Sequence, residues 1–282
     1  MKRWILKAAM AAALASGAGA ALAQSCNIVS ASASSTNAYD PFSSTSNDTQ
    51  GSVRFSCSRG WLQTQFPSTF WVGVSSSTGN LASGANSLPF QLSTNYAACS
   101  QAWGGNSGDT VSNAQTSWLY TNIGPLTSTF CFRIPGGQST AAPGTYTHNS
   151  LTVTIRSSNS SGRVWGTGTL SLAATVDPAC DFTTDPSPLV INYTSFQTTP
   201  GIGTSNFQLR CTRTTPYQLS VESGGSLLDL GYSLAVNASS ALGTGNAQSY
   251  TITGTAPAGQ SGTCASGAGC QATQARTLTI TY

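Results

Sequence analysis

SVRFSC (52–57) and NFQLRC (206–211) are two stretches in which apolar and polar residues alternate up to a cysteine. Alternation with a period of two puts the apolar side chains on one face of a β-strand and the polar side chains on the other. The pattern recurs in LTVTI (151–155) and LTITY (278–282), and Gly, Asn and Pro separate the runs. Many short, half-buried strands with such turns predict an all-β fold of the sandwich type.

The two cysteine-ended stretches belong to an internal repeat with a shift of 154 residues. Cys26 lies 31 residues before Cys57, and Cys180 lies 31 residues before Cys211. The same shift superposes four further pairs: Tyr39 on Tyr193, Val53 on Phe207, Phe55 on Leu209 and Arg59 on Arg213. Matched cysteines together with matched apolar positions indicate two copies of one domain.

The first residues have the features of a secretory signal peptide. Lys2, Arg3 and Lys7 precede an Ala-rich apolar run that ends in Ala-Leu-Ala at 21–23, and this order is typical of a cleaved export signal. The alternative is a membrane anchor, for which a run of about fifteen residues is short. The expected organisation is a signal peptide at 1–23, an N-terminal domain at 24–176 and a C-terminal domain at 177–282.

All the cysteines lie after the predicted cleavage site, and their even number in an exported chain predicts disulfides. The shared spacing favours Cys26 with Cys57 and Cys180 with Cys211, and it leaves one further pair in each copy. The full set is Cys26, Cys57, Cys99, Cys131, Cys180, Cys211, Cys264 and Cys270. Because the chain has no C-x-x-C motif and a single histidine, His148, we expect no metal site and no cofactor.

The charge pattern argues against nucleic acid and against catalysis. After residue 23 the chain has eight Arg and eight acidic residues, so it lacks the basic excess that a phosphate backbone requires. No G-x-S-x-G motif stands out, and the acidic residues are scattered around the lone His148. Since a hydrolase needs a positioned nucleophile and base, we expect no catalytic residues and no enzyme.

Several motifs carry a resemblance to a known family. They are a cysteine at the mature start, Tyr-Asp-Pro at 39–41, IPGGQSTAAPGTYTHNSLTVTI (134–155), TGTAPAGQSG (253–262) and TLTITY (277–282). In this order they resemble the spore coat protein U domain family, which is found in archaic chaperone–usher pili of the Csu type. The resemblance covers essentially the whole mature chain, although the second copy lacks a clear G-x-Y step.

The resemblance implies two tandem immunoglobulin-like β-sandwich domains, the second of which lacks one strand. In the family, the N-terminal extension of a neighbouring subunit supplies the missing strand. It also implies a periplasmic chaperone and an outer-membrane usher as partners, with export through the periplasm to a pilus on the cell surface.

Strand donation between subunits of this family leads to a prediction about which strands the chain donates and which it accepts. Only Gln24 and Ser25 precede Cys26, so we expect no donor extension at the mature N-terminus. The segment 168–180 alternates like a donor strand, and we expect it to fill the first domain in cis through Leu170, Leu172, Ala174 and Val176. The alternative is an ordinary last strand of that domain. The C-terminal domain would then accept a strand from an adjacent subunit, which is typical of a tip adhesin.

The tryptophans after residue 23 all lie in the first copy, which favours an adhesive N-terminal domain. Exposed apolar loop tips usually mark contact sites. The candidate adhesive residues are Trp61, Leu62, Phe66, Trp103 and Trp165, and the alternative for each is a core position. The resulting hypothesis is a tip adhesin for attachment and biofilm formation on abiotic or host surfaces. The alternatives are a glycan-binding, lectin-like adhesin and a secreted coat or matrix protein.

Overall fold

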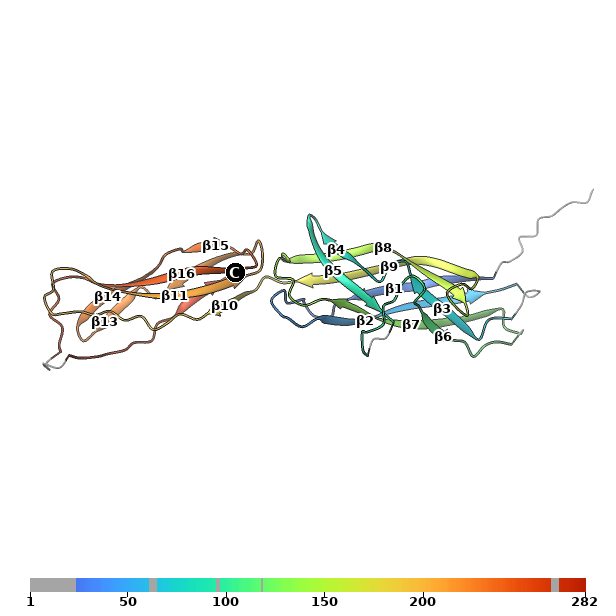
Figure 1. The fold of residues 1–282 in the computed structure, drawn as a ribbon, viewed down its shortest axis with the longest axis horizontal. Helices are drawn as coiled ribbons and strands as arrows, with labels where there is room; N and C mark the ends of the chain where they lie inside the picture. The colour runs from blue at the N-terminus through green and yellow to red at the C-terminus, as the bar shows by residue number, and fades with distance from the viewer. Residues whose placement is uncertain (1–23, 61–64, 95–96, 118, 265–268) are drawn as a thin grey trace, which may run out of the picture.

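The computed structural model describes residues 24–60, 65–94, 97–117, 119–264 and 269–282. These residues form two β-structures placed end to end, and they contain no helix (Figure 1). The prediction of an all-β fold is therefore confirmed. The predicted signal peptide, 1–23, lies outside the described residues, and within them there is no helix with the length and hydropathy to cross a membrane.

We use the predicted division to name residues 24–176 the front domain and residues 177–282 the back domain. The structure has one buried apolar cluster on each side of the short segment 177–179. The exact domain boundary remains a prediction.

The front domain is a sandwich whose strands form one continuous nine-stranded sheet, in the order β4-β5-β7-β2-β1-β9-β8-β3-β6. The strands are β1 (Ser25–Ser34), β2 (Asn47–Ser58), β3 (Thr69–Val74), β4 (Thr78–Ser83), β5 (Asn86–Ser93), β6 (Asp109–Ser112), β7 (Asn122–Ile134), β8 (Gly144–Ser157) and β9 (Val164–Val176). The alternating residues of these strands point inward, and Val53 and Phe55 of β2 are fully buried.

Strand β9 joins the two halves of this sandwich. It pairs antiparallel with β8 and parallel with β1. Its inward residues Leu170, Leu172, Ala174 and Val176 are all at most 2% exposed. The front domain therefore has a complete core.

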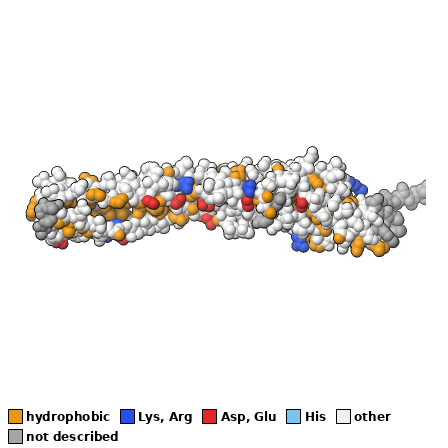
Figure 2. All heavy atoms as spheres, turned by 60° about the horizontal axis from the view of Figure 1, so that its bottom comes forward, with side chains coloured by type: hydrophobic (Ala, Val, Ile, Leu, Met, Phe, Trp, Pro, Cys, Tyr) orange, Lys and Arg blue, Asp and Glu red, His pale blue; other side chains and the backbone are white. Residues whose placement is uncertain are grey.

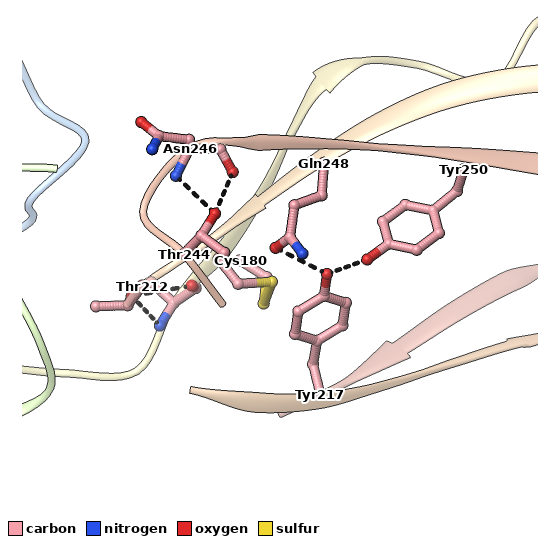
Figure 3. Close-up of a disulfide and its surroundings, with 9 residues drawn as sticks. Cys180, Thr212, Tyr217, Thr244, Asn246, Gln248 and Tyr250 are labelled. Atoms are coloured by element: carbon pink, nitrogen blue, oxygen red, sulfur yellow. Dashed lines mark hydrogen bonds between the residues drawn. A yellow bond between two sulfur atoms is a disulfide. The ribbon is translucent and has the colours of Figure 1, made fainter. Parts of the chain in front are cut away.

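The back domain is smaller and has two separate sheets, β10-β11-β16-β14-β13 and β15-β12-β17. Its strands are β10 (Cys180–Thr184), β11 (Gly201–Cys211), β12 (Pro216–Val221), β13 (Gly224–Leu227), β14 (Leu230–Val236), β15 (Ser240–Leu242), β16 (Ala247–Ala256) and β17 (Leu278–Thr281). Its core is built around Phe207, Leu209, Tyr217 and Leu219. In this core the hydroxyl groups of Tyr217 and Tyr250 are hydrogen-bonded to each other (Figure 3).

Four disulfides connect the strands and loops: Cys26–Cys57, Cys99–Cys131, Cys180–Cys211 and Cys264–Cys270. The first and the third are the pairs that the repeated spacing favours, and the other two are the pairs that it leaves. Cys26 faces Cys57 across β1 and β2, and Cys180 faces Cys211 across β10 and β11 in the same way. The repeat in the sequence thus corresponds to a repeat in the strand pairing.

The burial of β9 gives a first prediction. Replacing Leu172 by Ala removes a fully buried side chain and leaves a cavity, so we expect the free energy of unfolding of the front domain to fall by about 2–5 kcal/mol. The control is Ser171→Ala, since Ser171 is the exposed neighbour on the same strand. Urea unfolding followed by tryptophan fluorescence measures the difference. Equal stability of the two variants would contradict the assigned position of β9.

Candidate functional site

The main candidate site is an open sheet edge in the back domain. In the front domain, Val72 of β3 pairs with Ile155 of β8. In the back domain, Leu219 of β12 pairs with Ile280 of β17 in the same antiparallel way. Strand β17 therefore takes the place of β8. The other side of β8 carries β9, whereas among the described residues no strand pairs with the other side of β17.

The back domain also contains a counterpart of β1, the other strand that pairs with β9. Strand β10 takes the place of β1, because the two disulfides join the same pair of strands in each domain. Strand β1 pairs with β9, but β10 pairs only with β11 in the part of the chain that the structure describes. The back domain thus has both strands that should flank a counterpart of β9, with no described strand paired between them. We call this gap the acceptor edge.

The acceptor edge leaves apolar side chains incompletely covered. Val153 and Ile155 on β8 are fully buried. Leu278 and Ile280, their counterparts on β17, are only partly buried, and so is Phe182 of β10. Figure 2 shows hydrophobic side chains in a stripe along the half of the molecule that contains the back domain. An unpaired edge with incompletely covered apolar side chains is a template for a further strand.

The pairing also gives the direction of a strand that would fit this edge. Strand β9 runs parallel to β1 and antiparallel to β8. A counterpart in the back domain would run parallel to β10, which starts next to the front domain. It would therefore begin near Tyr282, at the C-terminus in the middle of the molecule (Figure 1), and leave at the end remote from the front domain.

The predicted in-cis donor residues lie in the corresponding place of the front domain. Leu170, Leu172, Ala174 and Val176 all point from β9 into the core. Both interpretations of this segment, a donor strand in cis and an ordinary last strand, predict this packing. The in-cis role therefore remains a prediction.

A second candidate site lies at the free end of the front domain. The pairs Ser25 with Ser58 and Ser58 with Asn122 bring three strand ends together, and Arg156 pairs with Val164. The described loop residues that follow these strand ends therefore meet at the end opposite the linker. We call them the distal loops: 59–60, 65–68, 113–117, 119–121 and 158–163. Apolar side chains are exposed here at Leu119 (69%), Tyr120 (43%) and Val164 (43%).

The predicted adhesive residues do not all lie on this surface. Phe66, Trp103 and Trp165 are at most 6% exposed, so the expectation that they form exposed loop tips is wrong. Trp61 and Leu62 lie outside the described residues. Leu119 and Tyr120 were not among the predicted residues, because they lie in an irregular stretch between two strands.

Packing explains why these three aromatic residues are buried. Trp165 is the second residue of β9 and points inward, where its ring lies 5.8 Å from that of Phe66 and 5.5 Å from that of Phe70. Trp103 lies in a loop, but its ring packs 4.5 Å from Phe130 and its Nε1 donates a hydrogen bond to the Val72 carbonyl at 2.9 Å. A buried indole N–H needs such a partner.

The comparison with protein families places one known domain in the first half of the chain. The model of the Spore Coat Protein U domain matches residues 10–154, about half of the chain. The chain belongs to the Spore Coat Protein U domain family. A search of curated proteins found no match.

Two solved structures are similar to this member of the family at low identity. One is the chaperone–tip adhesion subunit pre-assembly complex CsuC–CsuE of Acinetobacter baumannii, at 18% identity and a TM-score of 0.49, with 91% of this chain and 99% of that chain covered. The other is a mutant of the adhesin CfaE of enterotoxigenic E. coli, at 12% identity and a TM-score of 0.22, with 84% and 77% covered. These values are too low to transfer a function.

One surface ion pair of this family member joins two strands of the front domain. Asp48 accepts two hydrogen bonds of 2.7 Å from Arg133, and this contact holds the pKa of the Asp48 carboxyl below its usual value. Asp48 also lies near Cys99 and Cys131 in a group that could hold a metal ion by distance alone. Because the two sulfur atoms form a disulfide, they cannot act as thiolate ligands.

The buried position of Trp103 gives a second prediction. Trp103→Phe keeps an aromatic ring but leaves the buried Val72 carbonyl without the indole N–H, so we expect a loss of about 1–3 kcal/mol in the stability of the front domain. Thermal unfolding measures the loss. Tyr120→Phe is the control, because Tyr120 is exposed, and its stability should match that of the unsubstituted chain. A neutral Trp103→Phe would contradict the assigned contact.

Proposed function

We propose that this protein is a non-enzymatic pilus subunit that ends the fibre and acts as its tip adhesin in cell attachment and biofilm formation. The observation that carries the proposal is the acceptor edge: within the described residues no strand pairs with the second side of β10 or of β17, whereas in the front domain β9 pairs with both β1 and β8.

An added strand would satisfy the acceptor edge in two ways. Its backbone would hydrogen-bond to β10 on one side and to β17 on the other, as β9 does with β1 and β8. Its alternate side chains would cover Phe182, Leu278 and Ile280, which are partly exposed. The proposed partner is therefore an adjacent pilus subunit with an extended, alternating apolar segment.

The direction of this strand supports the terminal position of the front domain. The donated strand would leave the back domain at the end remote from the front domain, so the adjacent subunit would lie there. The distal loops are at the opposite end and would point away from the fibre. Leu119, Tyr120 and Val164 would then meet an abiotic or host surface.

An unfilled acceptor edge also requires protection before assembly. An open apolar edge promotes association with other chains, so we propose a periplasmic chaperone that covers it and an outer-membrane usher that exports the subunit to the cell surface. The four disulfides fit an oxidising compartment such as the periplasm.

A glycan-binding site has less support. A surface cavity of about 600 Å³ on the front domain is lined by Thr94, Gln101, Asp109, Thr110 and Thr129, among others. Its described lining contains no aromatic ring, although sugar-binding sites commonly stack sugars on such rings.

The third prediction tests the acceptor edge with the chain's own strand. GTLSLAATV (168–176) is fused after Tyr282 through a six-residue loop like 158–163, because the expected strand begins next to Tyr282. We expect a soluble monomer whose back domain melts at a higher temperature than that of the unfused chain, since the edge is now filled. The matched control carries Asn in place of both leucines of the added strand. If both fusions melt like the unfused chain, the back domain is self-contained and the proposal fails.

The fourth prediction tests the distal loops. Leu119→Ser with Tyr120→Ser removes exposed apolar area, and we expect binding to polystyrene to fall by about tenfold or more. Leu242→Ser is the control, because Leu242 is similarly exposed (55%) in the back domain. Adhesion is measured by the retention of cells that display the pilus. An equal loss in the control would indicate nonspecific hydrophobic binding rather than a tip site.

A further inference from the structure

The junction between the two domains has few free backbone torsions. Only residues 177–179 separate β9 from β10. Thr212 holds Ala179 to the back domain, because the Ala179 N–H donates to Thr212 Oγ1 at 2.9 Å and the Thr212 N–H donates to the Ala179 carbonyl at 2.8 Å. Cys180 is bonded to Cys211 immediately afterwards (Figure 3). The remaining linker is Asp177 and Pro178, and proline fixes its own φ angle.

A cation–π contact crosses the junction on one side of this linker. The guanidinium carbon of Arg210, on β11, lies 4.2 Å from the ring centroid of Phe42, in the front domain. Asp181 positions the same guanidinium through a 3.5 Å ion pair. The Arg210 Nε atom is buried and has no hydrogen-bond partner among the residues that the structure describes. The Phe42 ring is therefore a principal contact of this cation.

A close backbone approach crosses the junction at a second place. A Cβ atom added to Gly245 would lie 2.1 Å from the carbonyl oxygen of Ser139 in the front domain, so no side chain fits there. The Gly245 N–H donates to the Cys211 carbonyl at 3.0 Å, which ties this loop to the disulfide-bonded end of β11. The φ angle of Gly245 is 80°, a conformation that favours glycine.

We propose that the front and back domains form one rigid unit, whose orientation is fixed by the Phe42–Arg210 contact and the Gly245–Ser139 approach in addition to the clamped linker. A single linker would allow bending and twisting, whereas two lateral contacts in addition to it oppose both. This interface goes beyond the proposed function, because it holds whether or not a further strand joins the back domain. Its consequence is that the distal loops keep a fixed direction relative to β10 and β17.

Residual dipolar couplings of the ¹⁵N-labelled mature chain test this proposal. Two rigidly joined domains report one common alignment tensor, whereas mobile domains report tensors of different magnitude. We expect a common tensor for the unsubstituted chain and its loss in Phe42→Ser. The population of bent orientations should rise about fivefold, the factor that a cation–π contact of this kind contributes. Small-angle X-ray scattering should show a broader distribution of interdomain distances.

Phe196→Ser is the matched control, because Phe196 is 69% exposed and its segment bonds to Gln260 rather than to the front domain. Arg210→Gln removes the same contact from the side of the back domain. It therefore still tests the proposal in the case that Phe42→Ser disturbs the fold of the front domain. Independent tensors in the unsubstituted chain would overturn the proposal. So would a common tensor that both Phe42→Ser and Arg210→Gln retain. Neither result depends on the binding of a donor strand.

Discussion

The structure of each domain depends on what lies between two of its strands. These strands are β1 and β8 in the front domain, and β10 and β17 in the back domain. The backbone N–H and C=O groups on the facing sides of these two strands need partners, and the apolar side chains beneath them need cover. In the front domain β9 provides both, since it pairs with β1 and with β8. In the back domain no described strand pairs with β10 on one side and β17 on the other. The same arrangement of strands therefore gives one closed core and one open core.

The difference between the two domains shows in equivalent residues. Ile155 and Ile280 each pair with an inward residue of the neighbouring strand, yet Ile155 is fully buried and Ile280 is not. Strand β8 extends from Gly144 to Ser157, whereas β17 covers only Leu278–Thr281. A strand with neighbours on both sides is held along its length, and a strand with one neighbour is held only where that neighbour reaches. The open edge therefore accounts both for the short β17 and for its exposed apolar side chains.

Local patterns in the sequence were sufficient for the fold, because period-two alternation and matched cysteine spacing report directly on strands and on their pairing. Cys26 faces Cys57 and Cys180 faces Cys211 as the repeat indicates.

The exposure of side chains could not be predicted in this way. Trp103 lies in a Gly-rich loop, but that loop folds back so that its indole N–H meets the Val72 carbonyl. Leu119 and Tyr120 are exposed because no described segment covers them, and no local pattern reports this. The junction contact between Phe42 and Arg210 joins residues far apart in the sequence, and it is likewise invisible in composition or spacing.

The acceptor edge and the junction together define a path for mechanical load. In the proposed fibre, a pull from the adjacent subunit enters the back domain along a strand beside β10 and leaves it through residues 177–179. Load at the start of β10 would tend to peel this five-residue strand from β11. The bond between Cys180 and Cys211 lies at the first residue of β10 and the last residue of β11, so it carries the load covalently into the long strand. Because Arg210 and Gly245 lie beside the same bond and contact the front domain, the load reaches that domain at several points around the linker rather than through the linker alone.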